Sequence, residues 1–402
     1  MQQEKVILFH RLSFVPEGED VVVGRVDTGS YAVLPADGAE LLQRLSEGMA
    51  PQQAADWFEA NYDEAVDIDD FLESLADLGF VRSVDDAQPI NSAPRLQWLG
   101  RLVFSRLAWL VYLAIGVSWL AILASHRDIR PAPSQLFFSD SLLAMQLVII
   151  ASQFPTVCLH EGFHVLAGQR LGLASKLSIS NRFSFIVVET QSNGLLSLPR
   201  RRRYLPFLAG MLADIIVLAC LGIAAELTRS PGGALSLGGR ICLAVGFTVV
   251  SRLLWQFLLY LRTDLYYVIA TALNCHDLHE ASKAILKNRF WRAIGKTERL
   301  WDESQWTQRD LKVGRWYGYF LVLGFATAAT MTCFISIPVL TIYLRRLVHA
   351  LSSGTGNGLF WDSAFSLFWT FVQFCVPAYL ARRKRRIARR PGPRLLMNPG
   401  EV

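Results

Sequence analysis

Six apolar stretches, each close to or beyond the length of a membrane-spanning helix, constrain the fold of this 402-residue chain. A helix needs roughly 20 apolar residues to cross a bilayer, and inside hydrocarbon a helix satisfies its own backbone hydrogen bonds. Hydrophobic residues make up 52% of the chain, which is high for a soluble protein. We therefore predict a multi-pass α-helical membrane protein with about six spans. The predicted spans are Leu107–Ser125, Ser141–Gly168, Tyr204–Leu227, Ile241–Leu261, Tyr317–Leu344 and Leu359–Leu380.

Basic residues gather on one side of these predicted spans. They precede the first span, separate the second from the third, join the fourth to the fifth and follow the sixth, whereas the opposite loops hold few. Because positive residues stay inside, we expect both termini in the cytoplasm and the protein in the cell (inner) membrane. The second span then enters from outside, so its C-terminal half lies in the cytoplasmic half of the membrane. The basic clusters are Arg95–Arg106, Arg200–Arg203, Lys283–Arg315 and Arg382–Arg390.

Residues 1–90 differ from the rest in charge and in pattern. They carry 19 acidic and 5 basic side chains, a net charge of −14, against +20 for the remainder. Met1–Leu12 is too polar to form the apolar core of a cleavable signal peptide. Strand-like runs at Asp20–Val26 and Tyr31–Leu34, three helical stretches and a return at Phe80–Val81 predict a small α+β, winged-helix-like domain. The helical stretches are Ala36–Leu45, Pro51–Asn61 and Asp67–Leu78.

Within this domain, the stretch from residue 31 to residue 84 resembles PqqD-like domains. It reads YAVLPADGAELLQRLSEGMAPQQAADWFEANYDEAVDIDDFLESLADLGFVRSV. These domains recognise peptides in systems that modify ribosomally made peptides, and the resemblance implies that a leader peptide adds as a strand to the sheet. The alternative is a winged-helix protein-interaction domain without peptide specificity. DNA binding is excluded, because a net charge of −14 repels phosphate.

The second predicted span carries a metal-binding pattern, His160-Glu161-Gly162-Phe163-His164. Two histidines four residues apart lie on one face of a helix, where their imidazoles can grip one cation. Glu161 lies roughly 100° round the helix, where it can take a proton from a water activated by the metal. Because Leu143–Cys158 just before it is uncharged and mostly apolar, this cluster is not an ordinary solvated face.

A catalytic zinc usually has three protein ligands, so a third is expected elsewhere. Asp264 follows the fourth span at a depth similar to that of the histidines, although an aspartate there is also an ordinary helix N-cap. Asp214 lies inside the third span, where an unpaired acid costs about 2.5–3.5 kcal/mol. A metal site, a polar cavity or a hydrogen bond to a neighbouring span would offset that cost. His276 and His279, in a polar stretch, are more typical of exposed side chains than of a second metal site. The candidates considered are Glu189, Asp214, Asp264, His276 and His279.

Taken in this order, the motifs of residues 141–275 resemble the membrane core of site-2 proteases, which are intramembrane zinc metalloproteases. HEGFHVLAGQRLG matches the helical HExxH segment of that family. Two spans later RTDLYY, residues 262–267, occupies the place of the family's aspartate motif and is closest to the branch of peptide zinc metalloproteases. Leu265 stands where the main branch has glycine, which leaves the local loop geometry open.

This resemblance implies a set of site residues. Zn²⁺ would be held by His160, His164 and Asp264, with Glu161 as the catalytic acid and base. Ala209-Gly210-Met211-Leu212-Ala213-Asp214 stands where the family has A-G-P-x-x-N. Gly210 and Asp214 are therefore candidates for contact with the substrate or the transition state.

The predicted function is that of a metalloendopeptidase. We expect it to cleave a ribosomally synthesised precursor peptide delivered by the N-terminal domain. The first alternative is site-2-type cleavage of a membrane-anchored signalling protein, and the second is a non-catalytic membrane immunity or export partner. The expected partners are a peptide or membrane-protein substrate and the lipid bilayer, not nucleic acid, and no pattern specifies an oligomeric state.

The remaining segments complete the predicted organisation. A strand-like insert, including Phe183–Val188, either holds a substrate extended or forms a surface hairpin without substrate contact. The aromatic and basic residues before the fifth span predict interfacial helices. The six cysteines are scattered without a CxxC pair, which argues against a disulfide framework. The predicted segments are a linker at 91–106, the metalloprotease core at 107–275 with its insert at 176–198, interfacial helices at 276–316, C-terminal spans at 317–381 and a basic tail at 382–402.

Overall fold

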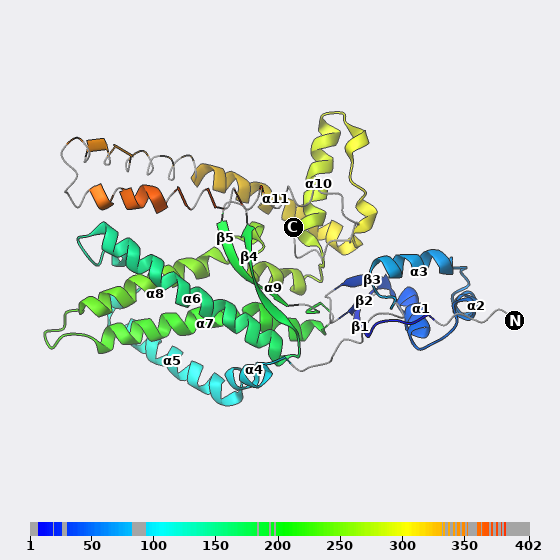
Figure 1. Cartoon of the computed structure of the whole chain (residues 1–402), viewed down its shortest axis with the longest axis horizontal. Helices are drawn as coiled ribbons and strands as arrows, with labels where there is room; N and C mark the ends of the chain where they lie inside the picture. The colour runs from blue at the N-terminus through cyan, green and yellow to red at the C-terminus, as the bar shows by residue number, and fades with distance from the viewer. Residues whose placement is uncertain are drawn as a thin grey trace.

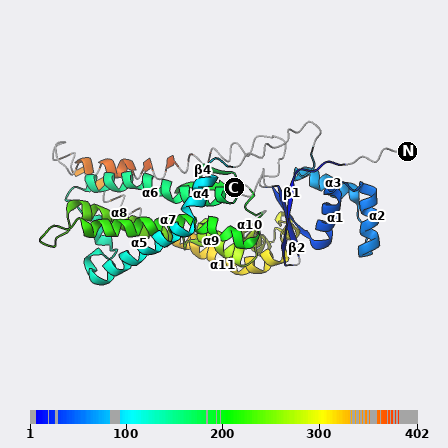
Figure 2. The ribbon, with the colours of Figure 1, turned by 90° about the horizontal axis from the view of Figure 1, so that it is seen from below.

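The computed structural model shows a long helical bundle with a small sheet-containing domain at one end (Figure 1). A view turned by 90° keeps this domain at the same end of the bundle (Figure 2). The described residues are 7–18, 20–25, 30–82, 94–182, 185–192, 194–196 and 198–331, with scattered helical positions between 333 and 382.

The N-terminal domain is a three-stranded antiparallel sheet, ordered β1-β2-β3, with three helices. β1 was absent from our prediction because Pro16 weakens its strand pattern; proline is tolerated here because β1 is an edge strand. A bridge between Phe9 and Val81 confirms the predicted return of the chain, while residues 26–29, which end the first predicted strand and lead to the second, lie outside the described part. The elements are β1 (Leu12–Glu17), β2 (Asp20–Arg25), β3 (Tyr31–Pro35), α1 (Ala36–Ser46), α2 (Pro51–Tyr62) and α3 (Ile68–Asp77).

Four of the described helices are long and apolar enough to cross a membrane, and they match the first four predicted spans. The short helix α4 (Gln97–Val103) precedes them and packs through Gly100 against the backbone of α6. Two turns of 3-10 helix, η1 (Arg127–Ile129) and η2 (Pro133–Leu136), connect the first two long helices. The long helices are α5 (Arg106–Ser125), α6 (Leu142–Arg170), α7 (Arg200–Leu227) and α8 (Leu237–Trp255).

The described part of the structure contains fewer membrane-length helices than the six spans predicted. Among the described helices, the fifth predicted span coincides only with the later part of α11 (Gln308–Met331). The first turns of α11 are polar, and this helix is not one of the four candidate spans. The sixth falls where positions are described only singly or in short groups. There, an Asp362 carboxylate oxygen accepts from the Leu143 amide at 2.8 Å, and Ser366 bonds the Gln146 side chain. This segment therefore lies against the first turns of α6.

α7 is the central helix of the bundle and packs on α5, α6, α8 and α9. Its buried face is rich in small residues. In lipid, the hydrophobic effect does not drive helices together, and small residues let neighbouring helices pack closely instead. A Cβ at Gly222, for instance, would collide with the Trp119 ring of α5. Small buried residues of this face are Ala209, Gly210, Ala213, Ala219, Gly222 and Ala225.

The remaining elements surround the end of the bundle that carries the N-terminal domain (Figure 1). The predicted strand-like insert is an antiparallel hairpin of two strands, longer than the single strand expected, and it packs on α6. Its register is continuous from Ser175 opposite Ser192 to Arg182 opposite Phe185. The elements are β4 (Ser175–Arg182), β5 (Phe185–Ser192), η3 (Leu259–Leu261), α9 (Asp264–Ala272), α10 (Leu278–Ala293), η4 (Thr297–Arg299) and η5 (Glu303–Gln305).

The N-terminal domain contacts the bundle through a buried ion pair. The Glu17 carboxylate at the end of β1 lies 2.5 Å from the guanidinium of Arg203 in the first turn of α7, with side-chain exposures of 3% and 2%. The second Glu17 oxygen lies 3.3 Å from His276, after α9. Nearby, the Tyr31 hydroxyl of β3 donates to Asp277 at 3.3 Å, and burial, with the Asp310 carboxylate, raises the pKa of Asp277. Glu17 therefore ties the domain to two elements of the bundle.

Replacing Glu17 should loosen this contact measurably. In Glu17→Ala, the Arg203 charge stays buried without its carboxylate, and breaking such a pair typically costs about 3–5 kcal/mol. We expect a clearly lower melting temperature for the full chain in detergent and faster amide exchange in β1. The matched control is Glu40→Ala, which removes an exposed ion pair with Arg44 and an exposed hydrogen bond from Tyr62, and should cost much less than the buried pair. Equal melting of the two variants would contradict a role for Glu17 in docking.

Candidate metal centre

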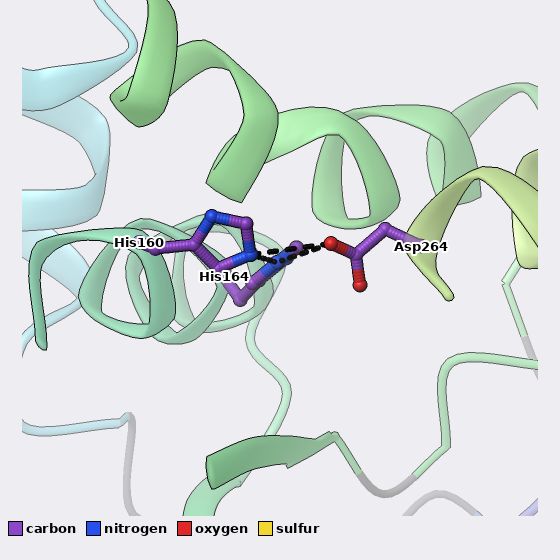
Figure 3. Close-up of side chains that lie close together, drawn as sticks. All are labelled: His160, His164 and Asp264. Carbon is purple, nitrogen blue, oxygen red and sulfur yellow. Dashed lines mark hydrogen bonds and ion pairs between the residues drawn. The ribbon is translucent and has the colours of Figure 1, made fainter. Parts of the chain in front are cut away.

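Three predicted ligand residues converge at one point, although Asp264 is 100 residues or more from the histidines in sequence (Figure 3). His160 and His164 lie on consecutive turns of α6, and Asp264 begins α9. The Nε2 atoms of the two histidines are 3.2 Å apart, and each faces the same Asp264 carboxylate oxygen, at 3.2 and 3.3 Å. Among the described residues, this is the group of histidine, cysteine and acidic side chains that could hold a metal ion.

The chemistry of the three facing atoms fits a cation. His160 Nδ1 lies 2.9 Å from an Asp214 carboxylate oxygen, and His164 Nδ1 lies 2.6 Å from the Pro206 carbonyl oxygen. Because these oxygens accept, each Nδ1 carries a proton, and each Nε2 is the ring nitrogen that can offer a lone pair to a metal. Ligands about 2.0–2.1 Å from a tetrahedral zinc lie roughly 3.4 Å apart, close to the sides of this triangle. The residues present therefore fit a zinc ion with one position left for water.

Asp264 is held in place by the end of α8. Gln256 Nε2 donates to the Asp264 carboxylate oxygen that faces the histidines, and the Asp264 amide donates to Gln256 Oε1, both at 3.0 Å. Thr263, rather than Asp264, is the N-cap of α9, and its hydroxyl donates to the Gln256 carbonyl at 2.6 Å. The two bonds with Gln256 hold the Asp264 carboxylate with one oxygen turned toward both histidines.

Glu161 is oriented by the hairpin beside α6. Its carboxylate Oε2 accepts from the Thr190 hydroxyl of β5 at 2.8 Å, and the same hydroxyl lies 3.2 Å from the Glu161 carbonyl. Glu161 is buried and directly follows His160 in the sequence. The hairpin thus contacts the candidate base. Whether the hairpin holds a substrate or is a surface hairpin without substrate contact stays a prediction.

Gly210 allows α7 to lie directly against the ligand histidines. A Cβ at this position would collide with the Nε2 atoms of both His160 and His164. Glycine is thus required by a close approach of backbone to the site rather than by an unusual backbone angle. The predicted contact of Gly210 with a substrate stays a prediction; its observed neighbours are the ligands.

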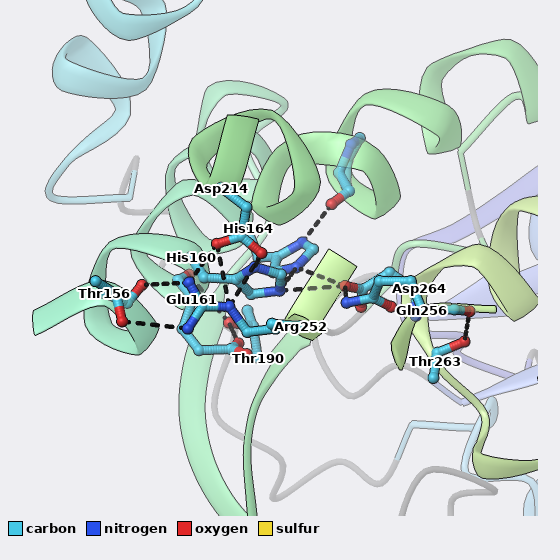
Figure 4. A network of polar contacts seen from close by, with 11 residues as sticks. Thr156, His160, Glu161, His164, Thr190, Asp214, Arg252, Gln256, Thr263 and Asp264 are labelled. Atoms are coloured by element: carbon cyan, nitrogen blue, oxygen red, sulfur yellow. Dashed lines mark hydrogen bonds and ion pairs between the residues drawn. The ribbon is translucent and has the colours of Figure 1, made fainter. Parts of the chain in front are cut away.

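Asp214 lies behind His160 rather than at an open surface (Figure 4). Its side chain is fully buried, and its two oxygens are taken by His160 Nδ1 and by the guanidinium of Arg252. Of the interpretations weighed from the sequence, a hydrogen bond to a neighbouring span describes this arrangement, and the predicted contact with substrate stays a prediction. The physical reason is that the carboxylate compensates the buried imidazole and guanidinium from the side away from Asp264.

The other candidate ligands do not join this group. His276 and His279 were expected to be solvent-exposed, but His279 is buried and the side chain of His276 is only 5% exposed: His276 contacts Glu17, and the His279 amide donates to the Tyr266 hydroxyl. Burial follows because α9, α10 and α11 pack together over this stretch and the N-terminal domain covers His276. The side chain of Glu189 lies outside the described part of the structure.

Four polar side chains near the site were not predicted: Thr156, Thr190, Arg252 and Gln256. A signal existed for Arg252, because a charged residue inside an apolar span, here Ile241–Leu261, usually marks a functional site. We applied the free-energy cost of a charge inside a span only to the acidic residues. Thr156, Thr190 and Gln256 carry no comparable signal, since uncharged polar residues are common in helices and strands.

The metal centre can be tested by metal content. We expect the purified full chain to hold about one zinc per chain, and His160→Ala with His164→Ala to lose it, because one carboxylate cannot hold the ion alone. Asp264→Ala should bind zinc much more weakly for the same reason. The control is His126→Ala, whose ring contacts Glu226 and belongs to no ligand group. Elemental analysis that finds equal zinc in all variants would contradict the site.

Gly210 gives a second, more local test. In Gly210→Ala, the added methyl must displace a ligand histidine or push α7 away, and such overpacking typically costs about 1–3 kcal/mol. We expect weaker zinc binding and a lower melting temperature. Gly162→Ala is the matched control, because Gly162 lies between the histidines on α6 and its Cβ would meet nothing within 4 Å. It should bind zinc as the unmodified chain does; equal binding by both variants would contradict the close approach.

Comparison with protein-family models, with curated proteins and with solved structures finds no match to this chain. The site is therefore characterised by its own geometry: three convergent ligand atoms, a buried carboxylate beside them and one supporting bond to each ligand. That donor set, with two of its three members on a helix long and apolar enough to cross a membrane, is the basis for the proposal that follows.

Proposed function

We propose that this chain is a membrane-embedded zinc metalloendopeptidase. The observation that carries the proposal is the convergence of His160 Nε2, His164 Nε2 and an Asp264 oxygen within 3.3 Å of one another, with Glu161 one residue from a ligand. Zinc sites with three protein ligands and an open position are typical of hydrolases, and an HExxH helix supplies its own base. The resemblance to site-2 proteases over residues 141–275 agrees with this chemistry.

Each residue then has a defined task in peptide hydrolysis. A Zn²⁺ ion at this site would polarise the scissile carbonyl and make water acidic enough to be deprotonated near neutral pH. Glu161 takes that proton and later returns it to the leaving amine. Thr190 holds one Glu161 oxygen at 2.8 Å and so fixes the direction of the other. His160, His164 and Asp264 hold the ion, supported respectively by Asp214, the Pro206 carbonyl and Gln256.

The proposal includes a position in the membrane. The site lies in the C-terminal half of α6, at the end of the bundle that carries the N-terminal domain. With the basic loops inside, this end faces the cytoplasm of the cell (inner) membrane, and so do both termini. A substrate bond would reach the metal from the cytoplasmic half of the bilayer or from its interface.

We further propose that the N-terminal domain delivers the substrate peptide. β3 pairs with β2 on one side only in the described structure, so its other edge can accept an extended peptide by strand addition. Tyr31 at the start of β3 bonds Asp277, which follows the helix that begins with the ligand Asp264. A peptide on β3 would therefore lie next to the segment that leads to the metal centre. A ribosomally made precursor with a leader is the substrate class that matches the PqqD-like resemblance.

The base provides the direct test. Glu161→Gln should keep about one zinc per chain, since Glu161 is not a ligand, but lower peptide cleavage by about 10²–10⁴-fold through loss of general acid–base catalysis. Purified full chain in detergent would be incubated with a peptide library, and new peptide ends would be identified by mass spectrometry. Full cleavage by the Glu161→Gln variant would sink the proposal.

A charge-matched control separates catalysis from folding. Glu226→Gln removes a carboxylate near the opposite end of α7, where its partners are His126 and Arg229. It should cleave as the unmodified chain does. If neither the unmodified chain nor Glu226→Gln cleaves any peptide while both hold zinc, the site binds metal without being a peptidase.

A further inference from the structure

Arg252 links three helices directly beside the metal centre (Figure 4). It belongs to α8, and its guanidinium forks onto Asp214 of α7, with Nη2 2.5 Å from Oδ1 and Nε 3.0 Å from Oδ2. Its other contacts are to Thr156 of α6, with Nη1 donating to the hydroxyl at 3.2 Å and Nη2 reaching the carbonyl at 3.5 Å. Such a planar fork fixes a carboxylate in orientation as well as in position.

The carboxylate that Arg252 holds is the one that bonds a ligand. Asp214 Oδ2 accepts from His160 Nδ1 at 2.9 Å, while Nε2 of the same ring faces His164 and Asp264. A hydrogen-bonded carboxylate behind a metal-ligating histidine fixes its tautomer and ring orientation and makes it a better donor to the metal. The contacts therefore form one chain, from Thr156 through Arg252 and Asp214 to His160.

Holding the helices together does not require these charges. One turn earlier on the same two helices, the Gln153 side chain donates to the Thr248 hydroxyl at 2.9 Å, a neutral link between α6 and α8. Charged groups inside membrane spans are costly, and buried ion pairs are often no more stabilising than apolar replacements. The Asp214–Arg252 pair is explained by its contact with His160, a ligand of the proposed metal.

We propose that Asp214 and Arg252 are positioning residues of the metal centre: Asp214 presents His160 Nε2 to the ion, and Arg252 holds Asp214 in the rotamer that does so. This rests on the proposed metal site but not on peptide hydrolysis. Neither residue touches the substrate or takes part in proton transfer.

The experiment compares metal binding with and without the pair. Asp214→Leu alone leaves the Arg252 charge buried and can fail to fold, so the decisive variant is the double change Asp214→Leu with Arg252→Met, which removes both charges and the acceptor for His160 Nδ1 together. Zinc affinity of the full chain in detergent would be measured by competition with a chelator. The absorption spectrum of bound Co²⁺ would report the ligand geometry. The matched control is Gln153→Leu with Thr248→Val, which removes the neutral α6–α8 link.

We expect the double variant to melt near the unmodified chain, to bind one metal ion and to do so with 10–100-fold lower affinity and an altered Co²⁺ spectrum. The control pair should keep both affinity and spectrum. Unchanged affinity and spectrum in the charge-free variant would overturn the proposal, as would an equal loss in the control, which would mean that helix packing alone matters. If the unmodified chain binds neither Zn²⁺ nor Co²⁺, the metal site itself fails, and the proposed function falls with it.

Discussion

At the end of the bundle that carries the N-terminal domain, three atoms that can each offer a lone pair to a metal face one another, an arrangement that a cation between them would make favourable. His160 and His164 present Nε2, and Asp264 presents a carboxylate oxygen, all within 3.3 Å. Asp214 and the Pro206 carbonyl fix the two imidazoles from behind, and Gln256 donates to the Asp264 oxygen that faces them, so none can turn away without leaving a buried polar group unpaired. The three residues come from α6 and α9 and their supporting bonds from α7 and the end of α8, so these four elements are held together at one level.

α7 connects this triangle to the rest of the molecule. Arg203, Pro206, Gly210 and Asp214 follow one another at spacings of three or four residues and so lie along one stripe of the helix. The first binds Glu17 of the N-terminal domain, the second and fourth hold the two histidines, and the third gives them room. Docking of the domain and support of the ligands thus share one face of one helix.

Sequence patterns predicted the parts of this arrangement that depend on local spacing. The apolar runs gave the four long helices, and histidines four residues apart gave two ligands on one helical face. Asp264 required topology as well, since only the order of spans placed it at the depth of His160. The fifth and sixth predicted spans were not matched, because α11 begins with polar turns and overlaps only half of the fifth. β1 was missed because Pro16 obscures an edge strand.

By itself, the sequence determined the membrane-length helices, the ligand pair on α6 and the acidic domain ahead of them, because these follow from composition and from periods of a few residues. The tertiary structure alone decided that Asp214 lies behind His160, that Arg252 and Gln256 support the site, and that His276 lies against Glu17. Most of these partners are tens to hundreds of residues apart, although Gln256 and Asp264 are separated by only eight. Their pairing is set by how helices and domain pack, and no local pattern encodes it.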